Sequence, residues 1–407
     1  MKVARLPLRF EATEILWRGT VNIRRDLAFW AVLYQMLEIT SEYSKEWCGE
    51  DTAPYLPKWK LLFALVFLLS LLFSIGESSV QSAQDSTTTL GLACERFTIN
   101  GQATFLLGFS YFAALGAPED FVRKDLDDFQ QRGFNWLRIF ATWNSFGTNI
   151  SAVDSGGHAR KPFIDKLTAI VDECDRRELI VDITLARGKG LLPDFNSHKV
   201  AVKTLVATLR LHRNWYLDLA NEHDVRDERY VSAEELKILR AEVRKLDPNR
   251  LVTASFGGHD VGREEIREAM QTGLDFLCPH RPRDAKSAGQ TLSKTRDCLA
   301  LLKEASAVRP VLYQEPFRRG YTDWEPKAGD FSLDLTGAIQ GGAAGWCFHN
   351  GSTRRGREER PRRSFDLRVR RLFDQLDSEE RKFVDDPIRT GSYPDRAPIQ
   401  REVNSEH

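Results

Sequence analysis

The sequence predicts an α/β fold in which eight parallel strands form a closed (β/α)₈ barrel. Apolar, strand-like segments alternate with amphipathic, helix-like segments, and eight such pairs follow one another along the chain. Strands that alternate with helices imply a parallel sheet. The eight pairs span about 280 residues, close to the roughly 250 of a typical TIM barrel. A doubly wound open sheet is the alternative, but the stretch GFSYFAALG after the first strand lacks the glycine-rich phosphate-binding turn of that fold.

The elements begin with a short N-terminal β-hairpin, because Asn100-Gly101 lies between two alternating apolar runs. Eight barrel strands are expected at 104–109, 134–140, 179–185, 215–220, 251–256, 274–279, 310–314 and 343–348. Eight helices are expected at 118–132, 162–176, 197–212, 232–246, 260–272, 287–306, 331–340 and 365–383. An acidic first turn and Gly133 delimit the first of these helices.

An apolar run, LLFALVFLLSLLFSI at 61–75, lies upstream of the barrel and follows two lysines. It is shorter than the roughly 20 residues that span a bilayer, and it matches the apolar core of a signal peptide. Small residues follow in ESSVQSAQ, so cleavage is expected after Ser82 or Ala83. The run therefore predicts an exported protein, either secreted or periplasmic after cleavage, or anchored to a membrane through 61–75. A buried core helix is disfavoured, because no polar face interrupts the run.

The position of this run shapes the expected organisation of the chain. Either residues 1–57 are a cytoplasmic extension of an uncleaved anchor, or translation starts downstream, which we favour. We expect an N-terminal extension at 1–57, a signal peptide or membrane anchor at 58–83 and a linker at 84–94. The barrel domain is then expected at 95–385, followed by a disordered tail at 386–407.

Composition excludes several classes of function. The formal net charge is zero and the pI is about 7.1, which implies no polyanionic partner. The arginine-rich stretch that begins at 353 contains interleaved acids, so a solvated surface is favoured there over a nucleic-acid patch. The six cysteines show no paired spacing that would predict a zinc site or a disulfide framework.

Two glutamates mark the expected active site, which in such barrels lies at the carboxyl ends of the strands. Glu222 ends the fourth strand and Glu315 ends the seventh, 93 residues apart, or three repeats of 31. This spacing places both carboxylates at equivalent positions on opposite sides of the barrel mouth. A pair of carboxylates that flanks one bond is the apparatus of glycoside hydrolysis. For either residue alone, a structural role is the alternative: a helix- or loop-capping acid at Glu222, or a salt bridge at Glu315.

The sequences ANE at 220–222 and YQE at 313–315 resemble the clan A glycoside hydrolases, in particular the cellulase-like family 5, over residues 95 to about 350. The resemblance implies that Glu222 is the general acid/base and Glu315 the nucleophile of a retaining mechanism. It also implies that Asp218 pairs with the strand-two arginine. The substrate-binding residues that it implies are Arg138 beside the nucleophile, Asn221 on the sugar 2-hydroxyl, the strand-six His280, and Trp346 as a sugar platform.

The chemistry of these residues agrees with the resemblance. Arg138 near Glu315 would keep that carboxylate ionised, because an opposite charge lowers a carboxyl pKa. An aromatic-walled cleft that includes Trp143 would desolvate Glu222 and raise its pKa, as a general acid requires. Aromatic faces also suit the apolar faces of sugar rings.

The sequence departs from the family pattern at four places. His223 follows Asn-Glu where the family has proline, Ala186 stands at a usual histidine, and Pro282 replaces a tyrosine that holds the nucleophile. Pro316-Phe317 also replaces a usual glycine, and Tyr313 is a candidate to supply part of the missing contact. These departures leave both glutamates intact and bring the substrate class into question.

We therefore predict a retaining glycoside hydrolase that cleaves a β-linked polysaccharide or oligosaccharide without metal or cofactor. A non-catalytic carbohydrate-binding barrel is the first alternative, favoured by the departures at Ala186 and Pro282. A metal-assisted barrel lyase or isomerase is the second. His223 and Asp224 could bind a metal together with His280, but their spacing matches no metal-binding motif. The sugar, endo or exo action and the oligomeric state stay open.

Overall fold

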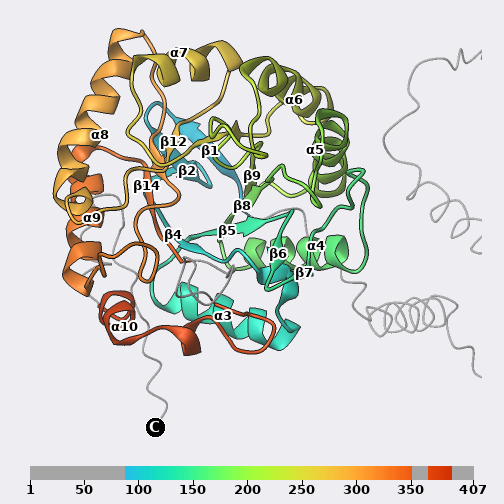
Figure 1. The fold of residues 1–407 in the computed structure, drawn as a ribbon, viewed down its shortest axis with the longest axis horizontal. Helices are drawn as coiled ribbons and strands as arrows, with labels where there is room; N and C mark the ends of the chain where they lie inside the picture. Colours follow the sequence, from blue (N-terminus) through green and yellow to red (C-terminus); the bar gives the residue numbers. More distant parts are fainter. Residues whose placement is uncertain (1–87, 351–364, 387–407) are drawn as a thin grey trace, which may run out of the picture. The chain divides into compact units, whose positions relative to one another are not determined.

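The computed structural model describes residues 88–350 and 365–386, and these form a parallel barrel ringed by helices (Figure 1). The barrel strands are β4 (Leu106–Ser110), β5 (Trp136–Phe140), β8 (Ile180–Thr184), β9 (Trp215–Asp218), β10 (Val252–Thr253), β11 (Ser255–Phe256), β12 (Cys278–Pro279), β13 (Leu312–Tyr313) and β14 (Gly345–Phe348). Each lies within or next to an expected strand, and the predicted (β/α)₈ class is confirmed.

The pairing of the strands closes the barrel. The main sheet has the order β10-β9-β8-β5-β4-β14-β13, and β11 pairs in parallel with β12. A parallel bridge between Leu277 and Val311 joins the β12 segment to the β13 segment. β10 and β11 are the two halves of the fifth strand, so the order around the barrel follows the order along the chain.

The helices lie outside the strands in sequence order (Figure 1). They are α3 (Glu119–Gln131), α4 (Phe163–Asp175), α5 (Phe195–Leu209), α6 (Ala233–Leu246), α7 (Arg263–Thr272), α8 (Ser287–Glu304), α9 (Ala328–Gly341) and α10 (Ser378–Val384). α6 shows how local sequence produces such a helix. Its first turn is capped by Ser232 and Glu235, and Leu236, Leu239 and Val243 recur at helical spacing on the buried face.

The last helix is shorter than the expected 365–383. Side chains in the first part of that range bond the local backbone instead, since the Asp366 carboxylate accepts the Arg368 N–H at 3.1 Å and the Gln375 amide donates to the Arg370 carbonyl at 2.8 Å. Such local bonds compete with helix formation. α10 begins only after Asp377, whose carboxylate caps its first turn.

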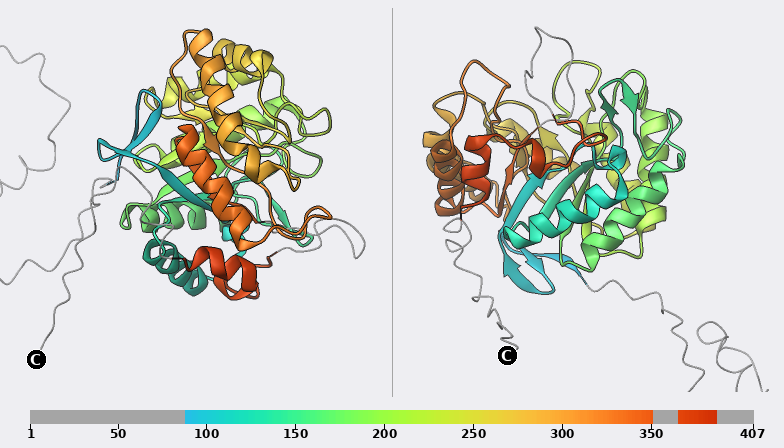
Figure 2. Two further views of the ribbon diagram at one scale, coloured as in Figure 1. Left: turned by 90° about the vertical axis from the view of Figure 1, so that its left-hand side faces the viewer. Right: turned by 90° about the horizontal axis from the view of Figure 1, so that it is seen from below.

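A three-stranded antiparallel sheet covers the end of the barrel where the strands begin (Figure 2). It comprises β1 (Leu90–Ala93), β2 (Arg96–Ile99) and β3 (Gln102–Thr104). The predicted hairpin is β2–β3, and both residues of its Asn100-Gly101 turn have positive φ. β1 corrects the expected linker at 84–94, because it adds a third strand to that hairpin. Thr88, just before it, also donates its N–H to Asp175 at 2.9 Å.

Several expected segments lie outside the described residues: the extension at 1–57, the apolar run at 61–75, the arginine-rich stretch up to 364 and the tail from 387. In the part of the chain that the structure describes, no helix is both long and apolar enough to cross a membrane. The described cysteines are all free thiols.

Candidate active site

The turn after β9 explains why a buried strand ends on an amide and a carboxylate. Along β9, Tyr216 and Asp218 point into the barrel while their neighbours pack outward against the helices. The chain then turns at Glu222. Its backbone φ of 49° is a strained conformation for any residue other than glycine. The Glu222 N–H donates to Ser255 Oγ at 2.9 Å, which holds this turn. This turn therefore places the Glu222 carboxylate at the barrel mouth.

Gly257 at the end of the fifth strand makes room for this turn. A Cβ added there would lie 2.5 Å from Val225 Cγ2 and 3.0 Å from Glu222 Cβ. Only glycine allows the two loops to approach this closely.

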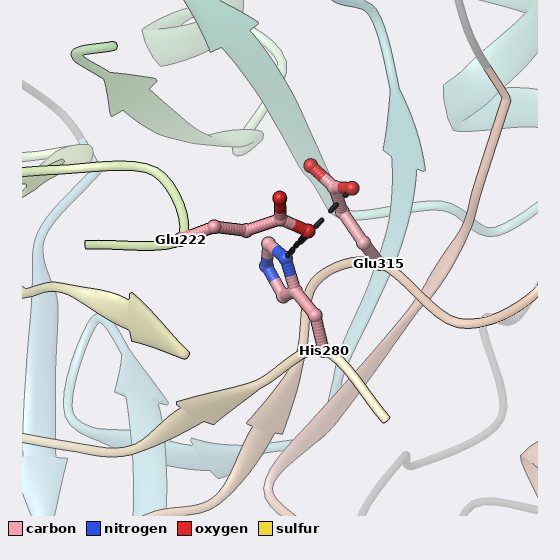
Figure 3. Close-up of side chains that lie close together, drawn as sticks. All are labelled: Glu222, His280 and Glu315. Carbon is pink, nitrogen blue, oxygen red and sulfur yellow. Dashed lines mark hydrogen bonds and ion pairs between the residues drawn. The ribbon is translucent and has the colours of Figure 1, made fainter. Parts of the chain in front are cut away.

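Glu222 and Glu315 point toward each other, and the His280 ring lies below the two carboxylates and contacts both (Figure 3). His280 Nδ1 lies 3.1 Å from Glu222 Oε1 and 3.8 Å from Glu315 Oε2. One ligand atom from each of the three residues lies within 4.8 Å of the others. The structure thus brings the two predicted catalytic carboxylates together with the predicted strand-six histidine.

Arg138 on β5 organises the floor of the site. Its fully buried guanidinium donates to Glu315, to Asp218 Oδ2 at 3.1 Å and to Asn221 Oδ1 at 2.9 Å. These contacts are the arrangement expected from the sequence for Arg138 and Asp218. Burial raises the pKa of the Glu315 carboxyl, but the charges of His280 and Arg138 outweigh burial and hold that pKa far below its usual range. Glu315 is therefore ionised at neutral pH.

A hydrogen-bonded layer lies in the barrel interior beside Arg138. Tyr216 donates its hydroxyl to Asp182 Oδ2 at 2.9 Å, and Gln314 donates its amide to the same oxygen at 2.7 Å. Arg138 Nε lies 3.2 Å from Asp182 Oδ2. Burial raises the pKa of Asp182 to about 7 despite this arginine. This layer fixes the orientation of Arg138 and hence of Glu315.

Two arginines that the sequence analysis did not single out contact the glutamates. Arg283 Nη2 lies 2.9 Å from Glu315 Oε2 and 3.2 Å from Glu222 Oε1, so it bridges the pair. Arg229, in the loop after β9, donates to Glu222 Oε2. The signal available was the basic character of HRPR at 280–283 and VRDER at 225–229, directly after two strand ends.

These arginines reverse the expected state of Glu222. Burial raises the pKa of its carboxyl, but the His280 hydrogen bond and the charges of Arg283 and Arg229 outweigh burial and lower that pKa well below its usual range. The expectation that desolvation dominates and raises the Glu222 pKa is wrong for the free protein. The reason is that the guanidinium groups of Arg229 and Arg283 reach Glu222, whereas the sequence predicts only aromatic walls around it.

The glutamates lie in a cleft of about 520 Å³. Trp143 lines it as expected and packs edge-on against Phe112, with ring centroids 5.6 Å apart. Asn221 and Ala186 also line the cleft. At Ala186 the small side chain leaves open space where the family resemblance implies a histidine.

Trp346 and Tyr313 do not reach this cleft. Trp346 is fully buried, donates its indole N–H to Asp334 on α9 at 2.6 Å and packs against Phe383 of α10. The Tyr313 hydroxyl lies 2.7 Å from Thr295 Oγ1 on α8. Strand alternation is the reason, because the next residue along each strand faces the barrel interior and so directs these two rings toward the helices. The expected sugar-platform role of Trp346 and the expected cleft contact of Tyr313 are therefore corrected.

His349 completes the surroundings of the nucleophile candidate. Its Nδ1 lies 3.0 Å from Ser110 Oγ and its Nε2 lies 3.5 Å from Glu315 Oε2. Burial lowers the pKa of His349 well below its usual value, so the ring is neutral. The sequence places His349 at the end of the eighth strand, but nothing in its pattern pairs it with Glu315.

Glu222, His280 and Glu315 are the described residues that could together hold a metal ion. The carboxylates of Glu222 and Glu315 already contact Arg138, Arg229 and Arg283. These arginines supply the neutralising charge that a metal cation would bring. His223 packs on Phe256 and faces the Val231 carbonyl, and Asp224 accepts the Gly257 N–H at 2.8 Å. The His223, Asp224 and His280 combination considered from the sequence is thus not assembled.

Comparisons with known proteins agree with this architecture. No model of a known protein family matches the chain, and no curated protein matches it. Among solved structures, a β-mannanase from Thermomonospora fusca is similar, with a TM-score of 0.54, 14% identity, and coverage of 76% of this chain and 98% of that chain. A glycoside hydrolase family 5 protein from Bacteroides vulgatus has a TM-score of 0.54 at 15% identity, covering 72% of this chain and 68% of that one.

An endo-1,4-β-mannanase from Rhizomucor miehei is also similar, with a TM-score of 0.50, 12% identity, and coverage of 64% of this chain and 89% of that chain. The chain therefore has the same TIM-barrel fold as these three structures. Its similar structures include family 5 enzymes, as the sequence motifs indicate. At this level of identity the likeness establishes the fold, and the activity is argued from the site.

Proposed function

We propose that the protein is a retaining glycoside hydrolase that cleaves a β-linked polysaccharide or oligosaccharide. The observation that carries this proposal is the convergence of Glu222 and Glu315 in one cleft. A carboxylate oxygen of Glu222 lies within 4.8 Å of a carboxylate oxygen of Glu315. Retaining enzymes hold their two carboxyl groups about 5–5.5 Å apart, whereas inverting enzymes leave about 6.5–9.5 Å for a water molecule. The mannanases among the similar structures make β-mannan the first polymer to test.

In this mechanism the ionised Glu315 attacks the anomeric carbon while Glu222 donates a proton to the leaving oxygen. Water then hydrolyses the glycosyl-enzyme ester, with Glu222 acting as base. Arg138 suits the first role because it keeps Glu315 ionised and oriented. Asn221, held by Arg138, lies at the cleft surface where it can bond a sugar hydroxyl.

The second role requires a change from the free state. Arg283 bridges the two carboxylates and so lies where the scissile bond must enter. Bound substrate has to displace Arg283 from this position. Its departure removes one charge that lowers the Glu222 pKa while burial continues to raise it, so Glu222 can take up the proton that it donates.

A non-catalytic carbohydrate-binding barrel is the second candidate. The observation in its favour is that Arg229 and Arg283 hold Glu222 ionised in the free protein, which opposes general acid catalysis. The two candidates differ in one measurable respect, because only the hydrolase releases reducing ends.

The test is hydrolysis by the full chain of β-mannan, β-glucan, β-xylan and aryl β-glycosides, with product anomers followed by NMR. Glu222→Gln and Glu315→Gln are the test variants. Glu228→Gln is the matched control, because Glu228 lines the same cleft and accepts the Lys189 N–H at 3.1 Å away from the catalytic pair. We expect retained configuration and a loss of about 10²–10⁴-fold in kcat for Glu222→Gln, with at least as large a loss for Glu315→Gln. Full activity in both variants refutes the site, and binding without cleavage by the unaltered chain supports the second candidate.

Export through residues 58–83 belongs to the same proposal, because a polysaccharide substrate is met outside the cell. Fractionation of cells that express the full chain, with a deletion of 61–75 as the control, tests this. Retention of the unaltered chain in the cytoplasm contradicts export.

A further inference from the structure

The cleft around the glutamates contains more cationic groups than the catalytic pair requires. The cationic side chains that line it are Arg187, Lys189, Arg229, Arg283 and Arg318. The acidic side chains that line it are Glu222, Asp227, Glu228 and Glu315. Lys189 is exposed to solvent. The arginines, by contrast, are partly or fully shielded, so their partners decide what the cleft can bind.

Three of these arginines are paired with carboxylates. Arg229 bonds Glu222 and lies 2.7 Å from Asp227 Oδ2. Arg187 lies 3.1 Å from Glu235 Oε2. Arg283 bridges the two catalytic glutamates. Their positive charge is therefore neutralised within the protein.

Arg318 differs from them. Within residues 88–350 and 365–386, no carboxylate lies within ion-pair distance of its guanidinium, and its Nε is buried without a hydrogen-bond partner. Its guanidinium carbon lies 4.7 Å from the centroid of the Tyr321 ring, and that of Arg283 lies 5.1 Å from the same ring. The adjacent Arg319 contrasts with it, because its Nε lies 2.6 Å from Asp377 Oδ2. Among the described residues, this partly buried cation at the cleft is thus left without an acidic partner.

We propose that Arg318 binds an anionic group of the substrate, so that the cleft selects an acidic β-glycan carrying a uronate carboxylate or a sulfate ester. This inference rests on the proposed function for the polymer class and names the kind of sugar within it. A guanidinium presents paired N–H groups that match carboxylate and sulfate oxygens, and such charge-assisted bonds are the strong ones. A neutral glycan offers only hydroxyl groups and would cover Arg318 without compensating its charge, which is costly.

The electrostatics of the cleft agree with this assignment. Burial, followed by the charge of Arg283, lowers the pKa of Arg318 to about 10, so the group remains cationic at neutral pH. The charge of an anion beside Arg318 would oppose both effects and raise this pKa. The charges of Glu315 and Glu222 raise the Arg318 pKa in part, but among the described residues neither carboxylate lies within ion-pair distance of its guanidinium.

The experiment measures dissociation constants of the full chain by calorimetry at low and high salt. The probes are a β-linked oligosaccharide that carries glucuronic acid, the same oligosaccharide with its carboxyl groups reduced to alcohols, and a sulfated derivative of that reduced form. The variants are Arg318→Met and Arg318→Lys, with Arg296→Met as the control. Arg296 is exposed on α8 and lies outside the cleft, so this control removes the same charge elsewhere.

We expect the unaltered chain to bind an acidic probe at least about tenfold more tightly than the neutral one, with the difference shrinking at high salt. Arg318→Met should lose about 10- to 100-fold in affinity for the acidic probe and little for the neutral one. Arg318→Lys should keep part of the preference, and Arg296→Met should keep all of it. The stronger of the carboxylate and sulfate probes identifies the anion.

Equal affinity of the unaltered chain for acidic and neutral probes overturns the inference, and so does an unchanged preference in a folded Arg318→Met protein. Thermal unfolding verifies that each variant is folded. Because binding needs no turnover, the outcomes separate the two proposals. An Arg318-dependent preference without hydrolysis rejects the hydrolase and keeps the anion site, whereas hydrolysis without an acidic preference does the reverse.

Discussion

The two ends of this barrel differ in the side chains that form them: one end is apolar and the other is charged. At the end where the strands begin, the β1–β3 sheet packs Phe97 against Phe276, with ring centroids 5.0 Å apart, and Tyr216 packs on the same ring. At the end where the strands finish, carboxylates and arginines gather around an open cleft. Apolar burial stabilises without direction, whereas charges act only with defined partners. The apolar end therefore contributes mainly to the stability of the fold, and the charged end contributes the candidate active site. This division is typical of TIM barrels.

Arg138 lies where these two regions meet, so its removal should have the largest effect on both. Arg138→Met leaves Asp182, Asp218 and Glu315 without their shared cation, and the breaking of a buried ion pair costs about 3–5 kcal/mol. We expect the free energy of unfolding, measured in urea, to fall by this amount, together with a loss of hydrolysis. A loss of less than about 1 kcal/mol would show that the ion pairs of Arg138 do not stabilise the folded protein.

Phe97→Ala tests the closed end alone. The side chain is fully buried between the sheet and the barrel, and removal of such a ring costs about 3 kcal/mol. We expect lower stability in urea but an unchanged kcat/KM for the folded fraction. A large change in kcat/KM would mean that the two ends are coupled.

Gly257→Ala tests the open end without removing a charged group. The added methyl group meets Val225 and Glu222, so it should displace the Glu222 carboxylate. A misplacement of about 1 Å costs up to roughly 100-fold in rate, and we expect a decrease of about 10- to 100-fold in kcat. Gly289→Ala is the control, because a Cβ there meets no atom within 4 Å. Equal activity of both variants would contradict the placement of Glu222.

Arg229→Gln has the smallest and most specific expected effect, a shift in pH dependence. The pKa of Glu222 is low in the free protein, so kcat/KM should decrease as the pH rises through that value. Removal of Arg229 removes one cause of the low pKa, so the basic limb should move to higher pH. The gain at pH 7 is about tenfold for each unit of pKa.

Arg226→Gln is the control for this shift, because Arg226 lies in the same loop but stacks on Tyr230. A basic limb that does not move in Arg229→Gln would show that another group donates the proton.

The sequence predicts the frame of this molecule better than its details. Alternating strands and helices, the Asn100-Gly101 turn and the spacing of Glu222 from Glu315 follow from local periodicity, and the structure confirms each of them. Periodicity does not give the phase of a strand near its end. The sequence therefore predicts Trp346 and Tyr313 in the cleft, whereas in the structure they face the helices.

Loops account for the rest of what was missed. Arg229 and Arg283 lie in irregular segments whose course depends on tertiary contacts such as the approach of Gly257 to Val225. Neither residue is part of a repeating pattern, so nothing local predicts that both reach Glu222. The ionisation state of Glu222 was consequently the least predictable property of the site.

The most direct test of the two-glutamate account is chemical rescue with azide on an activated aryl β-glycoside. In Glu315→Ala, azide enters the space of the missing nucleophile, and the account predicts an α-glycosyl azide. In Glu222→Ala, azide attacks the glycosyl-enzyme from the opposite face, and the account predicts a β-glycosyl azide. NMR distinguishes the two products. The same anomer from both variants, or rescue of neither, would contradict the assignment of Glu315 as nucleophile and Glu222 as acid/base.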